Sequence, residues 1–209
     1  MSETIREYHR RIVVYALLSL TALGSGQAAA IPAEDRPGDG SGVQALTVLQ
    51  TMRGHIESGR LDQALALLDA LSLEDADTRT RLEAHHMIGY VYQRKGEYGR
   101  ALEHYQRMLE HRDAMAAGLL AQTRYTAAQL SFALADFEQA VEHLRAWQRL
   151  GGSSAAGPYI LLGQAYFKVG DYPRAIRSLE TGISRAERQG QTVREDWLRL
   201  LQYLQAQRG

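Results

Sequence analysis

A ten-residue pattern that occurs four times in this 209-residue chain constrains its fold more than any other feature. One copy is GDYPRAIRSL, Gly170 to Leu179: a small residue, a charged residue, an aromatic residue or leucine, two further residues, alanine and an apolar residue. The four alanines, which lie 37, 39 and 35 residues apart, are Ala64, Ala101, Ala140 and Ala175. A period of this length is typical of stacked helical hairpins. From Val43 onward, apolar residues recur every three or four positions without strand-like alternation, so we predict an all-α solenoid.

Small residues at fixed positions indicate how the two helices of each hairpin pack. Gly89 and Gly163 precede Ala101 and Ala175 by 12 residues, and a tyrosine follows each glycine three positions later. We expect glycine and alanine to face each other where the helices cross. The small residue that opens the pattern should form the turn inside the hairpin, where positive φ favours glycine. The aromatic residues expected to fill the space beside the crossings are Tyr92, Tyr98, Tyr105, Phe137, Tyr166 and Tyr172.

This arrangement resembles the tetratricopeptide repeat, which has glycine then tyrosine in its first helix and alanine then a large apolar residue in its second. The resemblance implies about four repeats, at roughly residues 45–78, 82–115, 121–154 and 156–189. The second and fourth match well. The third has Ala128 and Ser131 in place of glycine and tyrosine. The first has Met52 and His55 there, so its assignment depends on its second helix alone.

A last apolar stripe follows the fourth repeat and is formed by Trp197, Leu200, Leu201 and Leu204. Its spacing predicts one amphipathic helix over about residues 192–207. We interpret it as a capping helix, since a solenoid needs a terminal element with a polar outer side. The alternative is that the stripe docks a partner or a second copy of the chain, which would give a homo-oligomer. The predicted solenoid domain covers residues 44–209.

The first 30 residues have the order of an export signal. Arginines at positions 6, 10 and 11 precede the uncharged run IVVYALLSLTAL, and alanines at positions 28 to 30 resemble a cleavage site. We predict a signal peptide over residues 1–30, a flexible linker over residues 31–43 and a periplasmic location. The alternative is an uncleaved membrane anchor, although the 12 strongly apolar residues are fewer than the about 20 that a span needs. Membrane contact is expected only if this segment is retained.

Charge and composition exclude several classes of partner and chemistry. The chain has 24 basic residues (lysine and arginine) and 24 acidic residues (aspartate and glutamate). This balance argues against nucleic acid as a partner, because phosphate binding needs a basic surface. The chain has no cysteine, so disulfides, cysteine-ligated metals and thiol catalysis are excluded. The glycine-rich stretch GGSSAAG, Gly151 to Gly157, lacks the Lys-Ser/Thr pair of a phosphate-binding loop.

Histidine and carboxylate residues form no pattern typical of an active site. His85 and His86 are adjacent, so on a helix they point about 100° apart. His104 and His111 lie about two turns apart, too far to bind one zinc ion without a third element. Carboxylate pairs such as Glu195 with Asp196 are expected at helix N-termini. We therefore predict no catalytic residue, no metal site and no cofactor.

One face of the first helices is the predicted binding surface, because the family resemblance implies that this face lines a concave groove. Gln129 and Gln164 occupy matching positions, as do Phe132 and Phe167, and such a ladder suits an extended peptide or a helix. The alternative is that the aromatic residues pack against neighbouring helices. The family's clamp for a C-terminal carboxylate is not expected, since tyrosine and glutamine stand at its lysine and asparagine positions. The predicted groove residues are His86, Tyr90, Gln93, Arg94, Gln122, Tyr125, Gln129, Phe132, Gln164, Phe167 and Lys168.

These features predict a non-catalytic scaffold that binds a protein or peptide partner in the periplasm. The fourth repeat and the following segment, Arg188 to Leu201, also resemble periplasmic repeat proteins that accompany TonB-type energy-transduction systems. Two alternatives stay open at this point. One is an assembly factor anchored in the inner membrane, and the other is an accessory subunit of an envelope enzyme.

Overall fold

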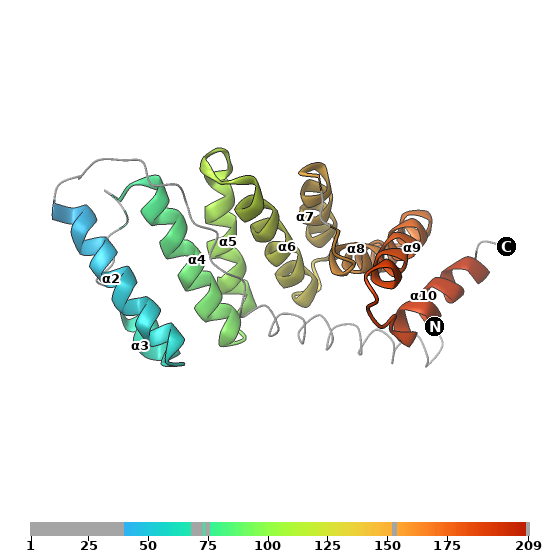
Figure 1. Ribbon diagram of the computed structural model, residues 1–209, viewed down its shortest axis with the longest axis horizontal. Helices are drawn as coiled ribbons and strands as arrows, with labels where there is room; N and C mark the ends of the chain where they lie inside the picture. The colour runs from blue at the N-terminus through green and yellow to red at the C-terminus, as the bar shows by residue number, and fades with distance from the viewer. Residues whose placement is uncertain (1–39, 68–72, 74–75, 152–153, 208–209) are drawn as a thin grey trace. The chain divides into compact units, whose positions relative to one another are not determined.

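The structure is a computed structural model that describes residues 40–67, 73, 76–151 and 154–207. The predicted signal peptide and most of the predicted linker lie outside the described residues. The described residues form two compact units, residues 40–123 and 124–207, and each unit has a hydrophobic core of its own. The all-α prediction is confirmed, since the elements of both units are helices (Figure 1).

Two helical hairpins make up most of the N-terminal unit. The first consists of α2 (Gly40–Glu57) and α3 (Leu61–Ala66), and the second of α4 (Thr78–Arg94) and α5 (Tyr98–Glu110). A short 3-10 turn, η2 (Arg112–Ala114), leads to α6 (Ala117–Ala133), whose last turns belong to the C-terminal unit. Helix α2 begins inside the segment predicted as a linker, so residues 40–43 are helical.

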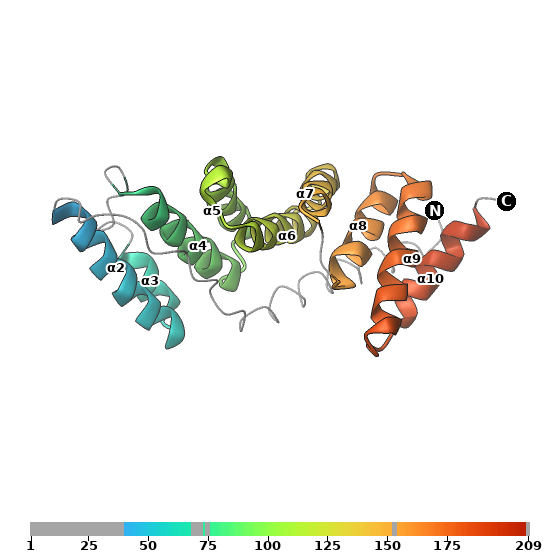
Figure 2. The same cartoon turned by 45° about the horizontal axis from the view of Figure 1, so that its top comes forward.

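The C-terminal unit continues the same plan. Helix α6 pairs with α7 (Phe137–Arg149), α8 (Gly157–Lys168) pairs with α9 (Tyr172–Arg188), and α10 (Glu195–Ala206) follows. Within this unit α8 contacts both α7 and α9, and α9 also contacts α10 (Figure 2). Leu200 and Leu204 of α10 are buried in the core shared with α9, which is how the predicted apolar stripe is covered.

The turn inside each hairpin has a residue with positive φ at the first position of the repeated pattern. Three of these residues are glycines, Gly59 at 71°, Gly96 at 79° and Gly170 at 81°. The third repeat has Ala135 there, at φ 63°. Asp136 and Asp171 then cap α7 and α9, because their carboxylates accept hydrogen bonds from backbone N–H groups at 3.0 and 3.1 Å. The turn therefore requires a positive φ whichever residue occupies it, and Ala135 adopts this backbone conformation at a cost in strain.

We expect Ala135→Gly to raise the free energy of unfolding by about 1 kcal/mol, because a left-handed conformation costs a residue with a Cβ about 1–2 kcal/mol. Chemical denaturation measures the difference. Ala133→Gly, two residues earlier at the last residue of α6, is the matched control and should lower stability by up to about 1 kcal/mol. Equal losses in both variants would contradict the assigned turn geometry.

Close crossings of the two helices confirm the role predicted for glycine and alanine. Ala64, Ala101, Ala140 and Ala175 are fully buried. A Cβ added at Gly163 would lie 2.6 Å from the Leu179 side chain, and one at Gly89 would lie 3.1 Å from the Tyr105 ring. The helices therefore pack at a distance that excludes even a methyl group at the tighter crossing.

No helix in the described ranges is long and apolar enough to cross a membrane.

Candidate partner-binding face

In the N-terminal unit, α4 carries four of the predicted groove residues. Two of them, Tyr90 and Arg94, are hydrogen-bonded to each other. Arg94 donates a hydrogen bond from Nη1 to the Tyr90 hydroxyl at 2.8 Å, and its guanidinium lies 5.7 Å from the Tyr90 ring centroid. Gln93 is buried, and its Oε1 accepts a hydrogen bond from the Tyr105 hydroxyl at 3.5 Å. His86 packs edge-on against Tyr105, and burial lowers its pKa. Tyr90 and Arg94 are thus the pair available at this surface, and Gln122 of α6 is exposed.

In the C-terminal unit, the predicted residues of α6 lie mostly in the core. Phe132 is 0% exposed and packs edge-on against Phe137 with ring centroids 5.1 Å apart. Gln129 is 2% exposed, and its Oε1 has no hydrogen-bond partner among the described residues. Burial raises the pKa of Tyr125 to about 12. The expectation that Gln129 and Phe132 face a partner is therefore not met, because the core covers both side chains.

Helix α8 carries the other three predicted residues, and aromatic rings surround its C-terminal end. Gln164 and Phe167 are mostly buried. The Phe167 ring lies 6.2 Å from Tyr203 of α10 and 6.1 Å from Tyr172 of α9, measured between centroids. Tyr172 is 42% exposed. Sequence reasoning did not place Tyr203 here, since the pattern within one repeat carries no information about contacts made by α10.

Lys168 is the feature of this face that the core does not explain. It is half-buried, and its Nζ lies 5.4 Å from the Phe137 ring centroid. Burial lowers its pKa to about 8. Among the described residues no carboxylate, hydroxyl or carbonyl pairs with this ammonium group. A cation removed from water without a compensating partner costs free energy, so the folded protein maintains an unfavourable charge here.

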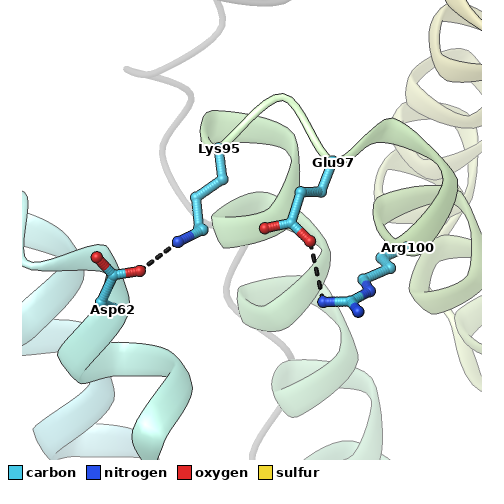
Figure 3. A network of polar contacts seen from close by, with 4 residues as sticks. All are labelled: Asp62, Lys95, Glu97 and Arg100. Carbon is cyan, nitrogen blue, oxygen red and sulfur yellow. Dashed lines mark hydrogen bonds and ion pairs between the residues drawn. The ribbon is translucent and has the colours of Figure 1, made fainter.

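The other lysine of the chain, Lys95, has the opposite environment (Figure 3). Its ammonium group forms an ion pair with Asp62 of α3, and this hydrogen bond raises its pKa. Beside it, Glu97 pairs with Arg100 at 3.0 Å between Oε2 and Nη1. The two lysines end first helices of different repeats, and the one that lacks a carboxylate is the more buried.

Comparisons with known proteins agree with this geometry. Two family models of the tetratricopeptide repeat match the chain, one over residues 82–113 and one over residues 156–189. The first range covers most of α4 and all of α5, and the second covers α8 and α9. The chain therefore contains tetratricopeptide repeats. Such a fold is a scaffold for protein–protein interaction.

Solved structures of MamA share the fold of this tetratricopeptide-repeat protein. The structure of MamA AMB-1 in space group P212121 has a TM-score of 0.64 and 17% identity, over 80% of this chain and 84% of that one. MamA 41-end from Desulfovibrio magneticus RS-1 has a TM-score of 0.61 and 17% identity, over 82% and 86%. No curated protein sequence matches significantly. At this identity the likeness concerns the fold alone.

We predict that Lys168 of this repeat protein titrates near pH 8, whereas Lys95 titrates above the ordinary range for lysine. Competitive labelling with an amine-reactive reagent, read by mass spectrometry, separates the two because they are the only lysines in the sequence. Lys168 should react at a lower pH than Lys95. Identical pH profiles would show that Lys168 is as well solvated as Lys95.

Two histidines occupy the same repeat position in second helices, three residues after the crossing alanines. His104 of α5 contacts His85 of α4, with 3.1 Å between their Nδ1 atoms. His143 of α7 has its Nδ1 3.2 Å from Nη1 of Arg124 in α6. Burial, together with the neighbouring His85 or Arg124, lowers the pKa of His104 and His143 to about 4. No group of three or more acidic or histidine side chains in the described part of the chain could hold a metal ion.

Acid should therefore destabilise both hairpins before the carboxylates titrate fully. Because the folded pKa lies below the unfolded value of about 6.5, the unfolded state binds more protons, and stability falls as the pH drops from about 6.5 to 4. We expect a loss of about 2 kcal/mol from the two groups, after allowing for solvent screening. Denaturation at several pH values should show a flatter dependence for His104→Gln with His143→Gln. An unchanged slope in that variant would contradict the assignment.

Proposed function

We propose that this protein is a non-catalytic scaffold that binds a segment of a protein partner at the C-terminal end of α8. The observation that carries the proposal is the half-buried ammonium of Lys168, which has a pKa lowered to about 8 and no counter-charge. A partner carboxylate at this position would offset a cost that the free protein bears, because an opposite charge within about 4–6 Å favours the charged form of lysine.

The surroundings of Lys168 suit a peptide that combines an acidic and an apolar side chain. The Phe137 ring of α7 lies beside its ammonium group, and the ring of the adjacent Phe167 packs edge-on against Tyr203 of α10. Such rings supply apolar contact area with little side-chain entropy to lose. The exposed ring of Tyr172 extends this surface beyond α8. The proposed segment therefore places an aspartate or glutamate on Lys168 and an apolar side chain against the rings.

Site-directed photo-crosslinking tests the proposal. Tyr203 is replaced by a photoreactive phenylalanine derivative, which keeps an aromatic ring in place, and Tyr98 of the N-terminal unit is the control position. We expect one recurrent crosslinked segment from position 203, identified by mass spectrometry and reduced by Lys168→Met. Crosslinks of equal pattern from both positions, or no effect of Lys168→Met, would refute this site.

We further propose that the protein acts in the periplasm. Support comes from the arginines at positions 6, 10 and 11, the apolar run over residues 12–23 and the alanines at positions 28 to 30. Protein isolated from the native envelope should begin at Ile31 by N-terminal sequencing. Recovery of the full N-terminus in the membrane fraction would instead favour the anchored alternative. Association with a TonB-type system is a prediction from the segment Arg188 to Leu201 alone.

A further inference from the structure

A basic hollow lies between α7 and the first turn of α8, away from Lys168. It has a volume of about 500 Å³ and is lined by Arg145, Gln148, Arg149 and Tyr159. Tyr159 and Lys168 are nine residues apart on α8, which is about two and a half turns, so they project from opposite sides of the helix. The hollow is therefore a surface separate from the candidate partner-binding face.

Helical spacing and aromatic packing give this hollow a fixed shape. Residues 145, 148 and 149 share one side of α7, since positions three and four apart are neighbours on a helix. Tyr159 packs edge-on against Trp147 with centroids 5.2 Å apart, and both rings are mostly buried. The guanidinium of Arg185 from α9 also lies 4.1 Å from the Tyr159 ring centroid. Tyr159, which lines the hollow beside Arg145 and Arg149, is thus held in place by Trp147 and Arg185.

The charges of Arg145 and Arg149 are not compensated. Among the described residues no carboxylate lies within ion-pair distance of either side chain. Elsewhere in the same unit, Arg174 pairs with Asp171 at 2.8 Å and Arg199 pairs with Glu195 at 2.7 Å. Arg149 at the end of α7 also interacts favourably with the helix dipole, but Arg145 lies one turn earlier, where that effect has faded.

We propose that this hollow binds an acidic, extended segment of a protein partner through two of its carboxylates. Arginine presents a planar set of donors that matches a carboxylate in two-point contacts. Side chains four apart on a helix are about 6 Å apart, and alternate side chains of an extended chain are separated by about 6.6–6.8 Å. Arg145 and Arg149 therefore match acidic residues at alternate positions of such a segment.

A protein segment fits this surface better than nucleic acid does. The whole chain has zero net charge, whereas nucleic acids need a basic track that follows many phosphates. Here the hollow offers only two uncompensated arginines, Arg145 and Arg149, one turn apart on α7, which is too few for such a track. The inference goes beyond the proposed function, because it involves other side chains and holds whether or not Lys168 binds a partner.

The test is a titration of the full chain with an octapeptide of alternating serine and glutamate, followed by the NMR signals of the two tryptophan indoles. Trp147 packs against the tyrosine of the hollow, whereas Trp197 belongs to α10. We expect a saturable shift of the Trp147 signal without a comparable shift of the Trp197 signal. The octapeptide of alternating serine and glutamine should leave both signals in place.

Variants make the assignment specific. Arg145→Gln with Arg149→Gln should weaken binding of the acidic octapeptide about twofold to thirtyfold, the range expected for two exposed charge contacts. Arg107→Gln with Arg177→Gln removes the same charge from exposed positions on α5 and α9 and should leave binding unchanged. The proposal is overturned by an unmoved Trp147 signal or by equal loss in both double variants. Tighter binding of a short DNA strand or of anionic lipid vesicles than of the peptide would overturn it too.

Discussion

Gly163→Ala should lower the free energy of unfolding by about 2 kcal/mol, the cost typical of overpacking a core. The added Cβ would lie 2.6 Å from Cγ of Leu179 and 3.1 Å from the backbone oxygen of Ala175. Leu179 is fully buried and the backbone cannot move without separating α8 from α9. The loss should exceed the helix propensity that alanine adds. Urea denaturation followed by circular dichroism measures it.

Gly99→Ala is the matched control. Gly99 lies in the first turn of α5, and a Cβ there would meet nothing within 4 Å. This variant should be up to about 1 kcal/mol more stable than the parent, because alanine favours helix. Stabilisation of similar size by both variants would show that the α8–α9 crossing is looser than described.

Lys168→Met should change stability and binding in opposite directions. Methionine keeps the apolar part of the side chain but removes an uncompensated, half-buried charge. We expect the free energy of unfolding at pH 7 to rise by about 1 kcal/mol. This value is small because solvent still reaches the ammonium group. Affinity for the segment crosslinked from position 203 should fall at least about tenfold, because the partner carboxylate would lose its counter-charge.

Lys95→Met controls for the loss of a lysine as such. Lys95 is exposed and already paired with Asp62 (Figure 3). Its replacement should leave the affinity for the partner segment unchanged and should not stabilise the protein. A stability gain without a loss of affinity in Lys168→Met would show that the charge at position 168 has no role in binding.

The repeat pattern was sufficient to predict the hairpins and their turns because those features depend on local backbone geometry. Positive φ at Gly96 and Gly170 and the tight crossing at Gly163 follow from residue type and spacing. Ala135 occupies the same turn position in the third repeat, and there the spacing predicts the positive φ although the residue is not glycine.

The binding face was harder to predict because matching repeat positions do not have matching surroundings. Arg94 and Lys168 are both seven residues before a crossing alanine, yet Arg94 contacts Tyr90 and Lys168 contacts an aromatic ring of α7. In the third repeat, the ring of Phe132 turns into the core against Phe137. Side chains from other helices decide these outcomes, and the pattern within one repeat contains no information about them.

A charge exchange between the two chains tests the central claim most directly. Lys168→Glu should abolish binding of the crosslinked partner segment, and replacing the segment's acidic residue by lysine should abolish binding to the parent protein. Isothermal titration calorimetry of the two variants together should recover at least about a tenth of the parent affinity, since the opposite charges again face each other. Additive losses, with no recovery in the combined pair, would contradict the proposed contact of Lys168 with a partner carboxylate.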